Sequence, residues 1–494
     1  MPELLAPEMF ATTLALVGAV IVIAALLSGF IERSGLPQVA VFLALGAILG
    51  PWGLSLMNVH LHSPILHVVS VLSLVLVLFT DAVSLDIKEV REHTRLVLRV
   101  LGPGTMLSAA LMAIAAKYLL WFSWPSAAIL GAALASTDPV MLRGLLKRRD
   151  LSAPVRQALR LESGLNDAVL LPVVLVSMAF FADKVFSATD WSHLALNMFL
   201  LGPGAGVAVG LVSVAVLDLI RRKIGVRRDY ESLYSLGVAF AAYSAAEALH
   251  GSGFLAAFSA GITISMLDVE LCDCFLEYGE TTAEMALLFT FVLFGSSLIW
   301  TGLTVLNWQT LLFVVAVLLA RPIAFSISLA GMKLKRGDCL LIAWFGPRGL
   351  SSLLLVLLPI FAGIPGMEKL FTICCAVVLF SIVIHGGSFM LLGRKSRPIT
   401  TTITPPQQIA PLKPAENKFV DSGSEIVDEG SIILSQVLEL QKKGEPVIIL
   451  DVRSERSFED SDLLAKGAIR IHPDEAVRKA NELGLDKEAW LIAF

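Results

Sequence analysis

Long apolar segments dominate the chain and divide it into membrane-length stretches. A helix needs about 20 mostly apolar residues to cross the hydrocarbon core of a bilayer. Such segments lie near residues 9–30, 36–57, 64–85, 96–120, 125–147, 154–181, 194–220, 230–249, 252–270, 281–300, 308–332, 338–362 and 370–393. The pattern predicts an all-α polytopic membrane protein with about thirteen transmembrane helices. Twelve stays open, because the sixth segment begins amphipathic and only His250 and Gly251 separate the eighth from the ninth.

The overall composition agrees with a membrane protein. Of 494 residues, 56% are hydrophobic and only 16% are charged. The net charge of −4 shows no basic excess, so no nucleic-acid partner is expected. The five cysteines lack the spacing of a disulfide framework and are interpreted as apolar filler, although Cys272 with Cys274, or Cys374 with Cys375, could bind metal. The first apolar segment has no basic region before it and is too long for a signal peptide, so it is expected to remain.

Positive charge is concentrated in alternate connections between the spans. The basic residues there are Lys88, Arg91 and Arg95; Arg143, Lys147, Arg148, Arg149 and Arg156; Arg221, Arg222, Lys223, Arg227 and Arg228; and Lys333, Lys335 and Arg336. By the positive-inside rule these connections face the cytoplasm. The prediction is a multi-pass protein of the cell (inner) membrane, with its N-terminus outside and its C-terminus in the cytoplasm.

The composition changes after the last apolar segment. Residues 1–397 form the predicted transmembrane domain, and residues 398–430 are rich in Pro, Thr and Glu without apolar periodicity, which indicates a flexible linker. Residues 431–494 alternate helical spacing (431–443 and 474–483) with β-branched or apolar runs (446–452 and 490–494). This alternation predicts a small cytoplasmic α/β domain.

The tail resembles the first half of a rhodanese-like domain. The resemblance rests on Asp451-Val452-Arg453 at the end of a strand and on the later step Gly467-Ala468-Ile469. In that family the sulfur-carrying Cys follows the strand that here ends at Phe494. The domain is therefore expected to be incomplete and to have no sulfurtransferase activity, and its ligand or partner is unknown.

Polar groups interrupt the fifth span at Ser136-Thr137-Asp138-Pro139. A proline in mid-helix removes a backbone hydrogen bond and frees carbonyl groups at membrane depth. Secondary transporters place ion sites at broken helices of this kind. A simple proline kink is the alternative, but Thr137 and Asp138 beside the proline favour an ion site.

The sixth span carries a compact set of oxygen-bearing side chains. Glu162 and Asn166 are four residues apart, as are Ser163 and Asp167, so each pair lies on one stripe of a helix and the two stripes adjoin. A cluster that only joins helices is the alternative. Since a charge at the centre of a span costs at least about 2.5 kcal/mol, two carboxylates favour a functional site.

An arginine in the twelfth span requires a buried counter-ion. Arg348 lies in Phe345-Gly346-Pro347-Arg348-Gly349, and Glu162 is its predicted partner. The thirteenth span is predicted to be interrupted at 381–387, opposite the broken fifth span. Asp81, at the end of the third span, is a possible accessory group.

Three of these motifs occur together in one family of transporters. Residues 10–393 resemble the membrane domain of cation/proton antiporters of the NhaP and NHE type, through Thr137-Asp138-Pro139, through the run from Glu162 to Asp167, and through Gly346-Pro347-Arg348-Gly349. The resemblance implies two inverted repeats, crossed broken helices, a six-helix transport bundle moving against a dimerisation domain, and a homodimer. The third span departs from the pattern, because Thr80 and Asp81 stand where many relatives have a Glu.

The resemblance also implies roles for single residues. Asp167 would carry the cation or the proton, with Thr137 and Ser163 as further ligands of the monovalent cation and with Asn166 and Asp138 in the same site. Glu162 and Arg348 would form a structural ion pair. The expected function is transport rather than enzyme catalysis: exchange of a monovalent cation, Na⁺ before K⁺ or Li⁺, for H⁺ by alternating access. Because Asn166 leaves one titratable carrier beside it, the exchange is expected to be electroneutral.

Two other functions stay open from the sequence. The tail could belong to a membrane-anchored protein that senses or transfers sulfur, and the polar groups of the spans could line a cation channel. Neither the antiporter nor the channel needs a cofactor beyond the transported ions, and none is expected.

Overall fold

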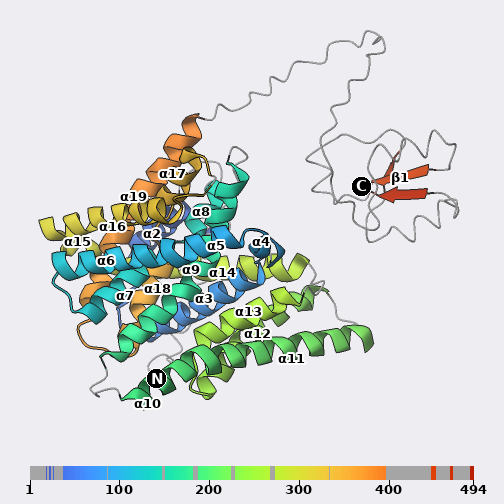
Figure 1. Cartoon of the computed structure of the whole chain (residues 1–494), viewed down its shortest axis with the longest axis horizontal. Helices are drawn as coiled ribbons and strands as arrows, with labels where there is room; N and C mark the ends of the chain where they lie inside the picture. The colour runs from blue at the N-terminus through green and yellow to red at the C-terminus, as the bar shows by residue number, and fades with distance from the viewer. Residues whose placement is uncertain are drawn as a thin grey trace, which may run out of the picture. The chain divides into compact units, whose positions relative to one another are not determined.

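The computed structural model describes residues 37–85, 87–146, 151–181, 187–223, 228–267, 273–332, 334–395, 447–451, 468–470 and 490–493, together with Gly18, Val22, Ile23 and Leu26. The chain divides into two compact units, residues 1–399 and residues 400–494. The first is built from helices and the second contains a small sheet, and each is described separately (Figure 1).

Helices fill the described part of the first unit. The α-helices are α2 (Gln38–Leu49), α3 (Pro64–Val83), α4 (Ile87–Glu92), α5 (Thr94–Arg99), α6 (Met106–Leu119), α7 (Trp124–Ala135), α8 (Pro139–Leu146), α9 (Ala153–Ala179), α10 (Ala188–Leu196), α11 (Gly202–Lys223), α12 (Arg228–Ala248), α13 (Gly253–Met266), α14 (Asp273–Leu293), α15 (Thr301–Thr304), α16 (Trp308–Ser328), α17 (Arg336–Trp344), α18 (Leu350–Phe361) and α19 (Glu368–Lys395). Single π-helical stretches, η2 (Val100–Thr105), η3 (Asn197–Leu201) and η4 (Phe294–Leu298), join neighbouring α-helices into longer rods.

Eight helical rods among the described residues are long and apolar enough to cross a membrane. They are Pro64–Val83, Thr94–Leu119, Trp124–Leu142, Ala153–Ala179, Thr189–Ile220, Thr281–Thr304, Trp308–Ser328 and Glu368–Ser388. Three shorter apolar helices, α2, α13 and α18, fall within predicted spans. The all-α membrane fold is thus confirmed. The count of thirteen stays a prediction, since the segment 9–30 lies almost entirely outside the described residues.

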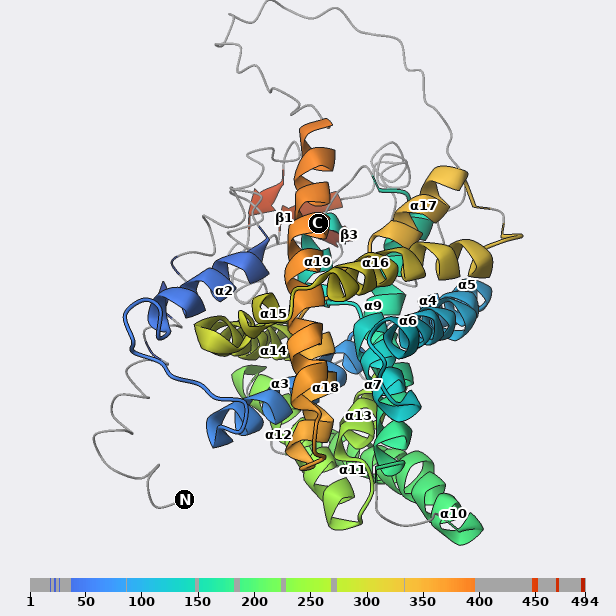
Figure 2. The same cartoon turned by 90° about the vertical axis from the view of Figure 1, so that its left-hand side faces the viewer.

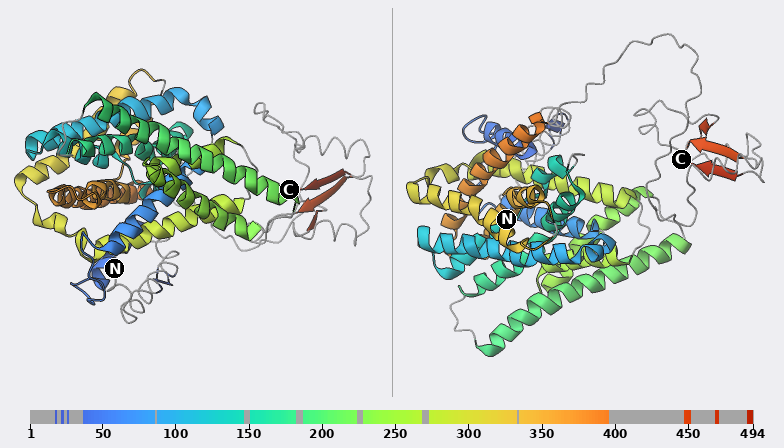
Figure 3. Two further views of the ribbon diagram at one scale, coloured as in Figure 1. Left: turned by 90° about the horizontal axis from the view of Figure 1, so that it is seen from below. Right: turned by 45° about the horizontal axis from the view of Figure 1, so that its top comes forward.

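Close helix packing depends on small residues. α7 packs against α6, where a Cβ at Gly131 would lie only 2.5 Å from the carbonyl oxygen of Ala109. Small residues at helix interfaces are typical of membrane proteins because they let backbones approach. On the other side of the unit α11, α12 and α13 pack together, as Figure 1 shows and as the green ribbons of Figure 3 allow the reader to follow.

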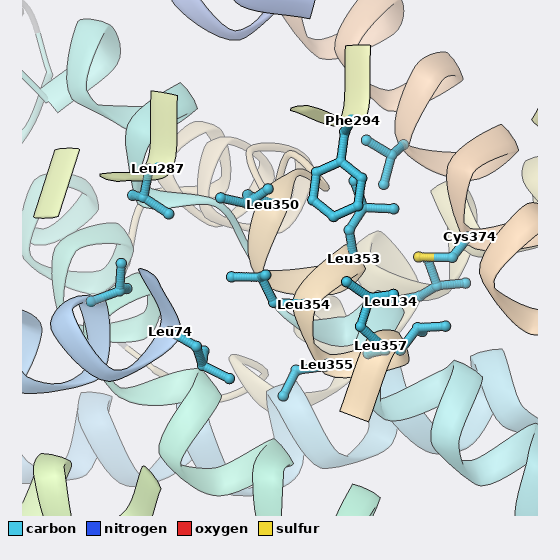
Figure 4. Close-up of a cluster of buried hydrophobic side chains, with 14 of the residues drawn as sticks. Leu74, Leu134, Leu287, Phe294, Leu350, Leu353, Leu354, Leu355, Leu357 and Cys374 are labelled. Atoms are coloured by element: carbon cyan, nitrogen blue, oxygen red, sulfur yellow. The ribbon is translucent and has the colours of Figure 1, made fainter. Parts of the chain in front are cut away.

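The helix α18 lies in the apolar core, although non-helical residues 345–349 precede it. Leu350, Leu353, Leu355 and Leu357 are all buried and meet side chains of other helices, among them Leu134 and Phe294 (Figure 4). α19 passes beside α18 and α16 (Figure 2). The apolar core therefore surrounds α18 from its first residue, and this packing fixes the position of its N-terminus.

The predicted interruption of the thirteenth span is wrong. α19 runs without a break through 381–387. Gly386 and Gly387 each cost a helix only about 1 kcal/mol and keep their backbone N–H groups, whereas a proline would remove one. The second interrupted span is instead the twelfth, where extended residues 345–349 separate α17 from α18.

The second unit contains a three-stranded parallel sheet in the order β2-β1-β3. Its strands are β1 (Val447–Asp451), β2 (Ile469–Arg470) and β3 (Trp490–Ala493), with Leu450 opposite both Ile469 and Ala493. The strands predicted at 446–452 and 490–494 are confirmed. The predicted helices 431–443 and 474–483 and the linker 398–430 lie outside the described residues, and the rhodanese-like assignment stays a prediction.

Candidate functional site

Two interrupted helices cross at one point. The first break, residues 136–138, separates α7 from α8, and the second, residues 345–349, separates α17 from α18. The N–H of Asp138 donates to the carbonyl oxygen of Pro347 at 3.0 Å. A Cβ at Gly349 would lie 1.7 Å from a carboxylate oxygen of Asp138, so only glycine permits this approach. The predicted break at Pro139 is confirmed.

Asp138 caps two helix N-termini at once. Its Oδ1 accepts the N–H of Val140 in α8 at 2.9 Å, and its Oδ2 accepts the N–H of Leu350 in α18 at 3.0 Å. A carboxylate satisfies free N–H groups at a helix start and complements the positive end of the helix dipole. Asp138, predicted to bind the ion, therefore also holds the two half-helices together.

α9 brings the predicted carrier against the first break. The hydroxyl of Ser136 donates to Oδ1 of Asp167, and the amide of Asn166 donates to Oγ1 of Thr137. The Thr137 hydroxyl donates in turn to Oε1 of Glu162 at 3.2 Å. All five side chains are buried. Within the part of the chain that the structure describes, the buried Oδ1 of Asn166 has no hydrogen-bond partner.

Glu162 pairs with Arg321, so the predicted Glu162–Arg348 ion pair is wrong. Arg321, on α16, donates from Nη1 and Nη2 to the two carboxylate oxygens at 2.5 and 2.8 Å. Its Nη2 also donates to the carbonyl oxygens of Ile342 and Phe345, at 3.1 and 3.2 Å, where α17 ends. This bidentate geometry gives both charges a buried partner.

Arg348 has a different set of acceptors. Its Nη1 donates to the carbonyl oxygens of Ala135 and Ser136 at 2.9 and 3.1 Å, at the C-terminal end of α7. Free carbonyls at the end of a half-helix carry partial negative charge and attract a cation. The side chain is directed to this helix end, which is the physical reason that it does not pair with Glu162.

The remaining candidates lie at different distances from the crossing. Ser163 is buried, and its hydroxyl donates to the carbonyl oxygen of Arg160 in its own helix at 3.2 Å. Asp81 on α3 is half-buried and lies beside α9. A Cβ built at Gly164 of α9 would be 4.0 Å from the Cβ of Asp81. No cluster of His, Cys, Asp and Glu able to hold a metal occurs among the described residues.

Sequence reasoning missed Arg321 and Ser136. Arg321 is a charged residue in the middle of an apolar helix, and that signal was sufficient to select it. The only sequence signal for Ser136 is its position before Thr137. That position does not show whether its hydroxyl points toward Asp167 or away from it. Ser351 on α18 also reaches Asp167 through its side chain.

The crossing gathers oxygen atoms of the kind that small cations prefer. Hydroxyls, an amide oxygen and carboxylates are buried close to one another here, and hard cations prefer oxygen ligands. A carboxylate can also accept a proton. Three carboxylates (Asp138, Glu162 and Asp167) and two guanidinium groups (Arg321 and Arg348) meet here, which leaves one negative charge without a compensating arginine.

The helical membrane fold, with buried polar side chains gathered at two crossed helix interruptions, is that of a membrane transporter. Residues 18–395 match the family model described as "Sodium/hydrogen exchanger, transmembrane". The chain belongs to this family of cation/proton antiporters, which are transporters rather than enzymes.

Several curated relatives are similar over most of the chain. The K⁺/H⁺ antiporter NhaP of Alkalimonas amylolytica is 26% identical over 83% of this chain and 71% of its own length. The K⁺/H⁺ antiporter NhaP2 of Shewanella sp. (strain MR-4) is 27% identical over 77% of this chain and 67% of its own. The Na⁺/H⁺ antiporter NhaG of Bacillus atrophaeus is 26% identical over 74% of this chain and 72% of its own.

A solved structure shares the fold. The sodium/proton antiporter MjNhaP1 of Methanocaldococcus jannaschii superposes with a TM-score of 0.63 at 20% identity. The superposition covers 77% of this chain and 100% of the MjNhaP1 chain. This likeness supports the arrangement of helices and says nothing of the transported ion.

Proposed function

We propose that the chain exchanges one monovalent cation for one proton at Asp167. One observation carries the proposal: at the crossing, Asp167 is the carboxylate held by hydroxyl groups alone. Glu162 is neutralised by Arg321, and Asp138 accepts two backbone N–H groups. The contacts of Asp167 are to Ser136 and Ser351. A cation or a proton that arrives therefore finds one carboxylate whose charge is still available.

The bound cation would be surrounded by oxygen atoms of two elements. Asp167, Asn166 and Ser163 come from α9, and Thr137 and Asp138 come from the first break. The free Oδ1 of Asn166 is buried and has no other partner among the described residues, so a cation ligand would satisfy it. Asp81 lies one helix away and is an accessory group in this proposal.

Na⁺ is the first candidate for the transported cation and K⁺ is the second. The pattern of motifs that links the chain to NhaP and NHE antiporters supports Na⁺. The names of two relatives, both K⁺/H⁺ antiporters, support K⁺. Release of protons from loaded vesicles on addition of Na⁺, K⁺ or Li⁺ orders the ions by the concentration that gives half-maximal exchange.

Alternating access would couple the two ions. Either ion neutralises Asp167, and only a neutral site crosses the apolar barrier at low cost. The two half-helix pairs would move as one body, because Asp138 and Gly349 join them. Exchange between the two ions follows from their competition for one carboxylate.

Asp167→Asn tests the proposed carrier. An amide cannot bind a proton or neutralise a cation, so exchange should vanish in reconstituted vesicles. Glu247→Gln is the control: Glu247 is an exposed carboxylate near the end of α12 that accepts the N–H of Gly253, the first residue of α13, at 3.0 Å. Antiport that survives in Asp167→Asn, with protein amount unchanged, would assign the carrier to another carboxylate.

Electroneutral exchange has its own test. If one proton replaces one monovalent cation, an imposed membrane voltage should not change the rate at fixed ion gradients. Vesicles with a clamped potassium gradient and valinomycin set the voltage. This clamp is used with Na⁺ or Li⁺ as substrate, and a voltage-dependent rate would contradict one-for-one exchange.

We also propose a homodimer in the cell (inner) membrane, with the N-terminus outside and the tail in the cytoplasm. The alternating basic connections support the orientation. The relatives' membrane domain supports a homodimer through the family resemblance. Cross-linking of single-cysteine variants in whole cells, and light scattering in detergent, measure the two properties.

A further inference from the structure

Two buried polar side chains of α19 have no part in the proposed function. Ser381 and His385 lie one helical turn apart and are 0% and 4% exposed. The backbone N–H of Arg348, in the second break, donates to Oγ of Ser381 at 2.7 Å. Nδ1 of His385 lies 3.1 Å from the same Oγ and 3.1 Å from the carbonyl oxygen of Ser381, so the ring contacts Ser381 at both oxygens. A residue of the broken helix is therefore hydrogen-bonded to a pair on a continuous neighbour.

The other side of the His385 ring contacts the beginning of the same break. Its ring centroid lies 5.7 Å from the indole of Trp344, the last residue of α17. The backbone of Trp344 also interacts with the ring. Residues 345–349 are thus held at both ends by α19, directly at Trp344 and through Ser381 at Arg348.

A continuous series of hydrogen bonds leads from this pair to the carrier. The backbone N–H of Arg348 donates to Oγ of Ser381, and its side-chain Nη1 donates to the carbonyl oxygen of Ser136 at 3.1 Å. The hydroxyl of Ser136 donates to Asp167. Each link is buried, and extended backbone at membrane depth has no helical ladder to hold it. A side chain of α19, Ser381, provides the hydrogen bond to the Arg348 N–H that a helical backbone would otherwise provide.

We propose that His385 is a positioning residue for cation binding: with Ser381 it holds Arg348, and through Arg348 and Ser136 it holds Asp167 in the geometry that binds the cation. The inference rests on Asp167 as the carrier. His385 touches neither ion, so its loss should weaken cation binding more than it slows turnover.

Two substitutions separate hydrogen bonding from packing at His385. His385→Phe keeps a ring against Trp344 and removes both nitrogens, whereas His385→Asn is smaller but places an amide near the position of Nδ1. An amide can donate or accept, so this variant does not depend on which ring nitrogen carries the proton. The bond between helices that His385 supports is the one from Arg348 N–H to Ser381 Oγ. Loss of one such hydrogen bond averages about 0.6 kcal/mol, which corresponds to roughly threefold in an equilibrium.

The experiment measures cation-dependent proton release in reconstituted vesicles, with KM and kcat determined separately. His385→Phe should raise the KM for the cation about threefold with a smaller change in kcat, and His385→Asn should stay closer to the parent. The opposite order, with His385→Phe like the parent and His385→Asn impaired, would show that the ring only fills space and would overturn the proposal.

A double substitution tests whether the pair acts through one path. Ser381→Ala should raise KM, and adding His385→Phe to it should add little, because residues in one network are not additive. Additive effects would mean separate roles and would overturn the path. Thr372→Ala is the control on the same helix, since that hydroxyl only donates to the carbonyl oxygen of Glu368.

The two proposals fail in distinguishable ways. If Asp167→Asn still exchanges ions, the proposed function is wrong whatever the His385 variants do. If Asp167→Asn is inactive and the His385 and Ser381 variants keep the KM of the parent, only the positioning role is wrong.

Discussion

The two interrupted helices resemble each other in form and differ in what supports them. At each break the C-terminal end of the first half-helix meets an arginine: Arg348 at the end of α7 and Arg321 at the end of α17. At each break the N–H groups of the second half-helix meet Asp138. The end of α7 depends on the other break for its arginine, whereas the end of α17 receives one from α16.

This difference makes the first break dependent on the second. Arg348 and Gly349 belong to the second break and Leu350 is the first residue of α18 behind it, and all three contact residues 135–138. The second break is fixed from outside by Arg321 and Ser381. A change in the second break should therefore disturb the carrier site, and the variants below test this order of dependence.

Gly349→Ala should have the largest effect. The new methyl group would overlap Asp138, whose carboxylate oxygen lies 1.7 Å from the Cβ position. The Asp138 carboxylate is buried and accepts two backbone N–H groups, so it cannot move away from the new methyl group. The crossing should therefore not form, and exchange should be lost. Vesicle transport and thermal melting in detergent measure the effect.

A second glycine on the same broken span provides the control for this substitution. Gly337, in α17, has open space where a Cβ would be, so Gly337→Ala should transport and melt like the parent. If Gly349→Ala did the same, the crossing would be looser than the structure shows and the dependence of the first break on the second would not hold.

Arg321→Met should be the next most severe change. Removing one partner of a buried ion pair costs about 3–5 kcal/mol, because the other charge is left uncompensated. The melting temperature in detergent should fall sharply. Combining it with Glu162→Gln should recover part of the loss, since no isolated charge would then remain.

The matched comparison uses the arginine that sequence reasoning selected. Glu162→Gln with Arg348→Met should show no such recovery, because Arg348 donates to the carbonyls at the end of α7 and not to Glu162. Recovery in this double variant and not in the other would restore the pair expected from the sequence.

Asp138→Asn should cost less than loss of the ion pair. The amide keeps one acceptor oxygen and loses both the second acceptor and the charge that faces two helix starts. Caps contribute about 0.5–2 kcal/mol each, so a loss of this order in unfolding free energy is expected. Ser123→Ala removes a cap from a single N-terminus, that of α7, at 3.3 Å from Ser126 N, and should cost less. Equal losses would contradict the double role of Asp138.

Local signals were sufficient for the first break and for the polar cluster of α9. Pro139 shows in sequence that a backbone hydrogen bond is missing, and the spacing of Glu162, Asn166 and Asp167 shows that they share neighbouring stripes of one helix. Both features are determined within a few residues. The structure places them against each other as predicted, through Ser136 and Thr137.

Partners across the bundle were beyond local reasoning. Arg321 and Arg348 are both buried arginines that require acceptors, and only the packing of α16 against α17 decides which one reaches Glu162. Gly386 and Gly387 suggested an interruption of the thirteenth span, but α19 continues through them. Ser381 of α19 instead accepts a hydrogen bond from Arg348 in the second break. The sequence identified most of the polar groups, although not Arg321 and Ser136. The packing of the helices decided which groups pair with each other.

Removal of residues 398–494 should have the smallest effect of all. Every described contact that positions Asp167 comes from helices and breaks before residue 396, and the three-stranded sheet belongs to the other compact unit. We therefore expect the truncated chain to exchange ions with the KM of the parent, although regulation by cytoplasmic ligands can change. Vesicle transport of the parent, the truncated chain and Asp167→Asn, compared at equal amounts of protein, provides the measurement. Truncation that abolished exchange as completely as Asp167→Asn would make the tail part of the transport cycle, and the two breaks would then not suffice to build the carrier site.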